Sequence, residues 1–341
     1  MDGTPCDLLP LGNAGGPGLS PLRVGLDMIW STDWASSGHR PCRWRRRAGV
    51  VVACGAFGTL ATTMMTPTLR CSVCGGRTTA AGAVDFNKSG ADWFEGERQF
   101  PVSEELVDYR RCRSCGFMFT AYFDDWSEAD FQARVYNEEY VVADPPFLAE
   151  RPLRLATYLS GVLGDALGKV SLLDFGAGEG RMVAELQRLG LEHGTSYDPY
   201  HADTPPPEGH HELVTAFEVV EHVPDQGALF DRLCGLVAPG GMLLLSTLLQ
   251  PEDIGAVGAE WWYACPRNGH LAFHTAGSLS ALLEPRGFTL VSLSAELHMA
   301  TRGTARLLRL FQEAEQGLEI SGASAPGAVS RPDGGPTSKG G

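Results

Sequence analysis

One segment constrains the fold more than any other: an apolar run, a glycine-rich turn and an amphipathic helix that follow one another directly. Residues 170–175 read as a buried strand, and Gly-Ala-Gly-Glu-Gly at 176–180 turns the chain. The apolar residues that follow have the i, i+1, i+4, i+7 spacing of one helix face: Met182, Val183, Leu186 and Leu189. A strand joined to a helix in this way predicts an open, mostly parallel α/β sheet.

The same turn predicts a nucleoside site. Glycine lets the backbone approach a ligand and adopt positive φ, and a helix start offers unpaired N–H groups. Asp198 lies about twenty residues after Gly178, at the end of a second strand expected over 195–197, where an acidic side chain can accept hydrogen bonds from ribose hydroxyls. Dinucleotide enzymes prefer a third glycine three residues after Gly178, but this chain has Arg181 there.

Further apolar runs complete the expected sheet. Residues 213–220 predict a strand and its exit, and residues 242–247 a further strand, with a helix between them that Pro-Gly-Gly at 239–241 ends. The apolar stripe of that helix comprises Leu229, Phe230, Leu233, Leu236 and Val237. Residues 199–211 are too few and too rich in proline for another helix and strand, so we expect an abbreviated sheet there.

Three segments resemble class I S-adenosylmethionine-dependent methyltransferases. Residues 172–180 (LLDFGAGEG) are similar to the family's glycine motif, residues 212–223 (ELVTAFEVVEHV) to its fourth-strand motif, and Pro-Gly-Gly at 239–241 to its turn before strand five. The resemblance implies a Rossmann-like methyltransferase sheet with helices on both faces, and S-adenosylmethionine as the cofactor.

The resemblance also implies which residues bind this cofactor: Asp174, Gly176, Ala177, Gly178, Asp198, Phe217 and Glu218. The turn would line the methionine and ribose part, and Asp198 would bind the ribose hydroxyls. Phe217 and Glu218 would lie near the sulfonium. Asp174 would orient the turn or the cofactor's amino group, or serve only as a structural partner of the turn.

Two copies of Cys-x-x-Cys-Gly predict a metal site. They supply Cys71, Cys74, Cys112 and Cys115. Two residues between cysteines in a tight turn let both thiolates face one tetrahedral ion, and four thiolates leave no open position. We expect structural zinc in a small zinc-knuckle domain; the alternatives are an iron–sulfur cluster, redox pairs or buried thiols. The long spacer implies an inserted loop or hairpin.

Methyltransferases with a leading pair of such motifs include sugar and natural-product enzymes, which this arrangement resembles. Residues 135–140, 144–147 and 151–152 are similar to segments of bacterial methyltransferases of unassigned substrate, often thought to act on glycans. Tyr136 or Tyr140 would cover the cofactor or pack at the domain junction.

The candidate bases are His222 and His270, because methylation of a hydroxyl requires removal of its proton. Glu221 is a weaker candidate. His270 ends an aromatic loop, 261–270, on the side where open α/β sheets bind ligands. In this loop Trp261 and Trp262 would stack on an acceptor or act as hydrophobic cover, and Arg267 would hold a phosphate or carboxylate.

The net charge of -14 disfavours nucleic acid as a partner. We therefore expect a small-molecule or carbohydrate acceptor, with O- or C-methylation of a sugar. An RNA methyltransferase is the alternative and needs a basic patch at the cysteine domain, to which Arg110, Arg111 and Arg113 would contribute. A non-catalytic cofactor-binding module is the third hypothesis. The sequence sets no oligomeric state.

Composition divides the chain into five zones: a disordered or misassigned leader over 1–66, a zinc-knuckle and cap region over 67–150, the methyltransferase domain over 151–300, a C-terminal helix over 301–316 and a disordered tail over 317–341. Met64 or Met65 would be the true start. An odd number of cysteines, nine, suits a reducing cytosol. The apolar run 48–61 is short for a bilayer span, so we expect a cytoplasmic protein without membrane association.

Overall fold

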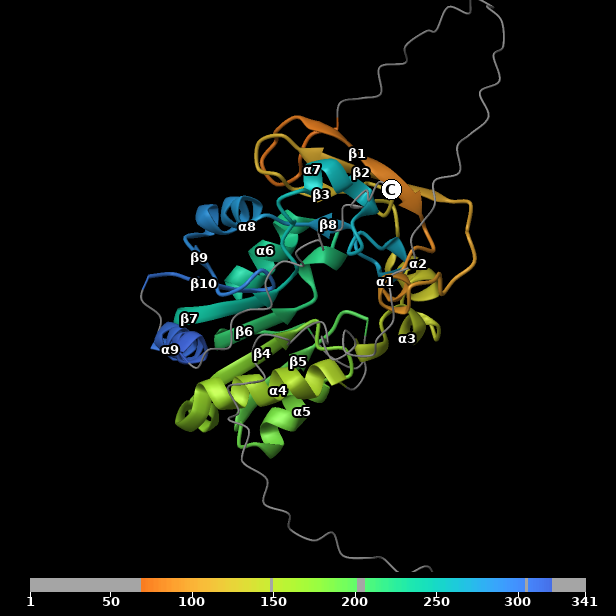
Figure 1. The fold of residues 1–341 in the computed structure, drawn as a ribbon. Coiled ribbons are helices and arrows are strands. Elements are labelled where there is room, and N and C mark those ends of the chain that lie inside the picture. The colour runs from red at the N-terminus through yellow and green to blue at the C-terminus, as the bar shows by residue number, and fades with distance from the viewer. Residues whose placement is uncertain (1–68, 148–149, 201–205, 304–305, 321–341) are drawn as a thin grey trace, which may run out of the picture.

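Two β-sheets organise the part of the chain that the computed structural model describes, namely residues 69–147, 150–200, 206–303 and 306–320 (Figure 1). The leader expected over 1–66 and the tail beyond 320 lie outside the described residues. No helix of the described part is long and apolar enough to cross a membrane.

The larger sheet has six strands in the order β5-β4-β6-β7-β10-β9. Their bounds are β4 Ser171–Phe175, β5 His193–Tyr197, β6 His211–Phe217, β7 Val237–Ser246, β9 Thr289–Ser292 and β10 Leu297–Thr301. The strands β5, β4, β6 and β7 run parallel, whereas β10 pairs antiparallel with both β7 and β9. The predicted Rossmann-like α/β sheet is confirmed.

Different helices cover the two faces of this sheet, because successive strand residues point to opposite sides. Leu172 and Leu213 belong to the cluster with α4 (Glu150–Leu163), α5 (Arg181–Arg188) and α9 (Arg306–Ile320). Leu173 and Val214 belong to the cluster with α6 (Gln226–Gly235) and α8 (Ala276–Leu283). Each strand therefore contributes to two hydrophobic cores.

Several predicted boundaries were wrong. The strand β6 begins at His211, two residues before the expected start, and a 3-10 turn, Val220–His222, follows its end at Phe217. The helix α6 ends at Gly235, before Pro-Gly-Gly. The strand β7 also begins before Pro-Gly-Gly, because Val237 already pairs with His211. The register then shifts before Leu213 pairs with Met242. The C-terminal helix α9 extends to Ile320, beyond the expected limit of 316. As predicted, the sheet is abbreviated: β5 is its edge, and the described residues hold no element between β5 and β6.

The smaller sheet has the order β1-β2-β3-β8 and is antiparallel. Its strands are β1 Thr78–Asp85, β2 Leu106–Cys112, β3 Met118–Phe119 and β8 Ala272–Phe273. The β1–β2 hairpin fills the spacer between the two cysteine motifs, as expected. Strand β8 comes from the chain after β7. The segment between β7 and α8 therefore supplies the last strand of the smaller sheet.

Short helices lie around the smaller sheet: α1 Ala91–Glu95, α2 Glu128–Arg134, α3 Tyr140–Ala143 and α7 Ile254–Val257. Further 3-10 turns lie at Pro145–Phe147, Gly164–Lys169, Gly258–Glu260, Pro266–Asn268 and Glu284–Arg286. A hydrophobic core rich in aromatic side chains joins the sheet to α2, α3 and α7, and Trp261 and Tyr263 from the loop after β7 are part of it.

Candidate active site and cysteine cluster

A cavity of about 630 Å³ opens at the carboxyl ends of β4, β5 and β6, where parallel α/β sheets bind ligands. Elements of the first region close its other side, since residues of α2 and α3 also line it. Nine residues proposed from the sequence are brought together on its wall: Asp174, Gly176, Ala177, Gly178, Asp198, Phe217, Glu218, His222 and His270.

The glycine turn has the backbone geometry that the sequence indicates. Gly176 has a φ of 80°, and a Cβ there would clash with the Val219 side chain, so the position requires glycine. The amides of Gly176 and Ala177 donate to the Tyr197 carbonyl oxygen at 2.7 and 3.0 Å. These two amides are therefore not the unpaired donors that we expected; they tie the turn to the end of β5.

Asp198 is fixed beside this turn. One carboxylate oxygen accepts the Gly178 amide at 2.8 Å, and the other accepts the Tyr200 amide at 2.8 Å. The carboxylate thereby holds the glycine turn and the segment after β5 together at the cavity wall.

Asp174, the neighbouring carboxyl group, is 5 % exposed. The Thr215 hydroxyl donates to it at 2.7 Å. Burial, with a smaller contribution from the charge of Asp198, raises the pKa of Asp174 from 3.8 to about 7. The structure therefore gives Asp174 a partner within the sheet in addition to its place on the cavity wall.

Glu218 adopts a φ of 53°, which is uncommon outside glycine. The Ser246 hydroxyl donates to its carboxylate at 3.0 Å and also accepts its amide at 2.9 Å. Burial raises the pKa of Glu218, and the nearby positive charge of Arg151 opposes this rise. The guanidinium of Arg151 in turn makes two 2.9 Å bonds to Asp144, so a buried ion pair forms part of the wall.

The two histidines lie against each other, with ring centroids 4.8 Å apart. Nδ1 of His270 is 2.9 Å from the Tyr263 carbonyl oxygen, which can only accept, so Nδ1 carries the proton and Nε2 keeps its lone pair. Burial lowers the pKa of His270 to about 4. Burial and the neighbouring His270 and Arg151 lower the pKa of His222 well below its usual value. Both rings are therefore neutral near pH 7.

Glu221 lies next to this pair and is fully buried. The Tyr263 hydroxyl donates to its Oε1 at 2.6 Å, while its Oε2 has no partner. Burial and the charge of Glu218 raise the pKa of Glu221 well above its usual value. Its ligand atom lies within 4.8 Å of those of His222 and His270, close enough for the three groups to share a proton or a cation.

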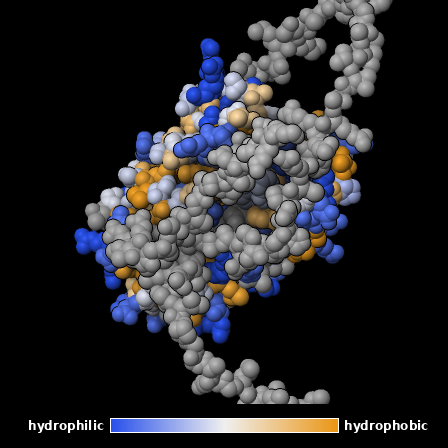
Figure 2. All heavy atoms as spheres, in the orientation of Figure 1, coloured by the Kyte–Doolittle hydropathy of each residue, from blue (hydrophilic) through white to orange (hydrophobic). Residues whose placement is uncertain are grey.

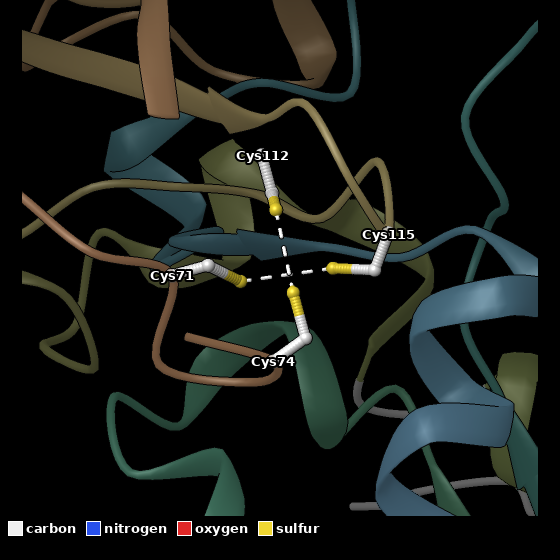
Figure 3. Close-up of side chains that lie close together, drawn as sticks. All are labelled: Cys71, Cys74, Cys112 and Cys115. Carbon is white, nitrogen blue, oxygen red and sulfur yellow. Dashed lines mark hydrogen bonds between the residues drawn. The ribbon is translucent and has the colours of Figure 1, made fainter. Parts of the chain in front are cut away.

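The four cysteines of the two motifs converge on one point (Figure 3). The sulfurs of Cys71 and Cys115 are 3.6 Å apart, and those of Cys74 and Cys112 are 3.5 Å apart. These distances are far longer than a disulfide bond and close to the ~3.8 Å edge of a tetrahedron with 2.3 Å zinc–sulfur bonds. The donor set therefore fits a closed tetrahedral metal site.

Other proposed residues lie elsewhere. Trp261 and Trp262 do not line the cavity, and Trp261 is buried in the core of the smaller sheet. Arg267 is 2 % exposed and donates to the Val135 carbonyl and to Asn137 and Glu139, so it is not free to hold an acceptor. Tyr136 and Tyr140 do line the cavity.

The Asp144–Arg151 ion pair and Tyr200 were not predicted from the sequence. Opposite charges seven residues apart, near the start of a helix, were the only available signal for the pair, and Tyr200 had none beyond its closeness to Asp198.

Comparison with known proteins agrees with this geometry. A family model described as a methyltransferase domain matches residues 144–293. The ubiquinone biosynthesis O-methyltransferase of Xanthomonas axonopodis pv. citri (strain 306) is 31 % identical over 214 residues, which cover 53 % of this chain and 88 % of that protein. The ubiquinone biosynthesis O-methyltransferase of Psychrobacter arcticus is 27 % identical over 223 residues, covering 60 % of this chain and 79 % of that protein.

Among solved structures, the 1,6-didemethyltoxoflavin-N1-methyltransferase of Burkholderia thailandensis is 18 % identical, with a TM-score of 0.38 and coverage of 60 % of this chain and 98 % of that one. The first relative matches over most of its length at 31 % identity. The family model's match, residues 144–293, includes the glycine turn and β6. The chain belongs to the class I S-adenosylmethionine-dependent methyltransferases.

Proposed function

We propose that the enzyme methylates a hydroxyl oxygen of a small ring-shaped molecule in the cavity, and that His222 accepts the proton of this hydroxyl. S-adenosylmethionine, when bound, supplies the methyl group on an activated sulfonium. The acceptor oxygen bonds to the methyl carbon as the sulfur–methyl bond breaks, and the hydroxyl proton passes to the base. The neutral imidazole pair at the carboxyl end of β6 is the observation that carries this proposal.

The cofactor would lie against the glycine turn. Each oxygen of Asp198 accepts one backbone amide and keeps lone-pair capacity, so the carboxylate can also accept ribose hydroxyls. The turn of Gly176, Ala177 and Gly178 has no side chain larger than a methyl group, which leaves room for the methionine and ribose part. Phe217 and Glu218 would lie near the sulfonium, and Asp174 near the amino group.

The two histidines have different surroundings. His222 is half-buried and its Nδ1 lies 3.2 Å from the Tyr136 hydroxyl, so its ring is held at the wall. His270 is 2 % exposed and is fixed through Nδ1. We therefore assign proton removal to His222, and to His270 the positioning of the His222 ring and the support of its charge once it is protonated.

The acceptor is a ring compound, because a group of aromatic side chains lines part of the cavity. Tyr136 lies between Tyr140 and Tyr200, with ring centroids 5.2 and 4.9 Å away. Such rings pack against the face of a sugar or of a phenol. The names of the Xanthomonas and Psychrobacter relatives specify O-methylation, which supports oxygen as the methylated atom. A sugar hydroxyl and a phenol both fit this chemistry.

The cysteine cluster would hold one zinc ion in a structural role. Its four thiolates leave no coordination position for a substrate. Zinc would fix the two cysteine turns to each other, and with them the hairpin that connects them.

The experiment is a transfer assay with methyl-labelled S-adenosylmethionine and three acceptor panels: nucleotide sugars, phenols and RNA. A labelled methyl group on an ether oxygen of a sugar or phenol product supports the proposal. Label only in RNA, or only on carbon or nitrogen, contradicts it.

A further inference from the structure

Four arginines gather beside the cysteine cluster, and we call them the arginine face: Arg70, Arg77, Arg111 and Arg113. Arg70 pairs with Arg77 in an isolated antiparallel bridge. The register that pairs Thr78 with Cys112 puts Arg77 opposite Arg113, whose amide donates to the Arg77 carbonyl at 2.9 Å. Three segments therefore bring three arginines into one row, and Arg111 lies two residues before Arg113.

From the alternation of an extended chain and the pairing of its segments, we expect these side chains on one side of the backbone. Directly paired residues project to the same side, and alternate residues along a strand do too. Thr78 and Cys112 project to the other side. Paired side chains have Cβ atoms only about 5 Å apart, and like charges directly opposite each other destabilise a sheet. The row of arginines thus has an energetic cost that the fold itself does not explain.

In the described part of the chain, no ion pair includes any of these four arginines. The contacts of the arginine face are to neutral atoms. Arg70 donates to the Gly75 carbonyl at 3.2 Å, and Arg111 donates to the Gln250 side chain at 2.9 Å. Arg70, Arg77 and Arg113 are exposed. Figure 2 shows strongly hydrophilic residues projecting at the end of the molecule where Figure 1 draws β1 and β2.

The chain offers no obvious counter-charge of its own. A zinc ion with four thiolates has a net charge of about -2, but Cys112 projects to the opposite side of the hairpin, where Arg110 donates to Thr78 at 3.0 Å. Residues 1–68 contain more Lys and Arg than Asp and Glu, and so does the segment 321–341. These two segments therefore carry no excess of negative charge that would neutralise the arginine face.

We propose that the arginine face docks a short segment of a partner protein that is rich in Asp and Glu. Guanidinium groups pair with carboxylates through two parallel hydrogen bonds, so closely spaced arginines suit closely spaced carboxylates. Leu69, next to Arg70, is 36 % exposed and offers an apolar contact to the same segment. This surface is separate from the cavity and does not depend on the identity of the acceptor.

Two observations favour an acidic peptide over nucleic acid. The protein as a whole has a net charge of -14, which repels a long polyanion extending beyond the row. Single-stranded nucleic acid also needs exposed aromatic rings for stacking. The segments 69–80 and 108–117 contain only two aromatic residues, Tyr109 and Phe117, and both are 1 % exposed.

The test is fluorescence anisotropy with a labelled Glu- and Leu-containing peptide and the full-length, zinc-loaded protein. We expect binding that weakens as salt rises from low ionic strength to ~0.3 M, where screening is strong. The double variant Arg77→Gln/Arg113→Gln should bind about tenfold more weakly, since two charge-assisted pairs are lost. Arg77→Lys/Arg113→Lys keeps the charge without the forked donors and should be intermediate.

Arg110→Gln is the matched control, because it removes an arginine of the same hairpin from the opposite side; it should bind the peptide normally. Zinc content and affinity for S-adenosylhomocysteine should be unchanged in the Gln double variant. The proposal is overturned by equal peptide binding in that variant, by tighter binding of an RNA oligonucleotide than of the peptide, or by loss of zinc, which would show that the arginines serve the cluster.

Discussion

The hydroxyl of Tyr136 lies 3.2 Å from Nδ1 of His222. Tyr136 belongs to the segment between α2 and α3, whereas His222 ends the turn after β6. A residue from the N-terminal part of the described chain, Tyr136, therefore holds the ring of His222, the proposed general base, which follows a strand of the larger sheet. The predictions below test that relationship and the roles of the groups around it.

His222→Gln should lower kcat by about 10²- to 10⁴-fold, the usual range for a general base, with little change in cofactor affinity. His270→Gln should lower kcat less, because this ring supports the base. Steady-state kinetics and cofactor titration measure both effects. His193→Gln, at an exposed position of β5 outside the cavity, is the control. Normal turnover in His222→Gln would remove this residue from the mechanism.

Tyr136→Phe should reduce kcat about fivefold through loss of one hydrogen bond to the imidazole, an effect of about 1 kcal/mol. KM for the acceptor should rise less, since the ring and its aromatic contacts stay. The pH profile of kcat should shift as well, because the hydroxyl next to the titrating ring is lost. A variant with raised KM and unchanged kcat would show that Tyr136 only holds the acceptor.

Asp198→Ala should weaken S-adenosylmethionine binding by about 10- to 100-fold, because the carboxylate both accepts ribose hydroxyls and holds the Gly178 amide. Asp198→Asn should recover part of the affinity. Calorimetric titration measures both. Asp231→Ala, in an exposed pair with Arg286, is the comparison. Undiminished binding in Asp198→Ala refutes the assigned role.

Asp174 should make the apoprotein less stable as pH rises from about 4 to 7. Its folded-state pKa is about 7 against 3.8 when unfolded, so unfolding releases a proton in this window and rising pH favours the unfolded chain. The full effect is about 4 kcal/mol at pH values above 7. Asp174→Asn should flatten this part of the dependence of Tm on pH. An identical slope in both proteins would mean that Asp174 ionises normally.

Zinc content should be near one ion per chain, and Cys71→Ser/Cys112→Ser should lose it together with much of the thermal stability, because structural zinc contributes directly to folding. Elemental analysis and thermal unfolding measure the two quantities. Cys234→Ser, a buried cysteine outside the cluster, should retain its zinc. Iron with acid-labile sulfide in the purified protein would identify the site as an iron–sulfur cluster instead.

The sequence predicted those features that depend on local chain geometry. The strand, the glycine turn and Asp198 are placed by adjacent residues and by parallel pairing of β4 with β5, so their convergence could be foreseen. The four cysteines could be foreseen for the same reason, since each pair is a tight turn and only the hairpin between them had to be inferred.

The features that failed depend on tertiary packing. Trp261 was expected either to stack on an acceptor or to act as hydrophobic cover, and it is buried because the chain after β7 returns to the smaller sheet and forms β8. Arg267 is occupied by a carbonyl and side chains more than a hundred residues earlier in the chain. No periodicity within residues 261–270 distinguishes an exposed aromatic loop from one that is covered in this way.

Strand β8 has a consequence for the construction of variants. Since β3 finds its second neighbour in a strand that follows β7, the cysteine-containing part is interwoven with the catalytic half and is not a detachable appendage. Deleting the residues before α4 would remove β3, the strand that pairs with β8, and would also remove α2 and α3, which line one side of the cavity. Grafting the metal-binding hairpin onto another scaffold would likewise require carrying residues 254–273 with it.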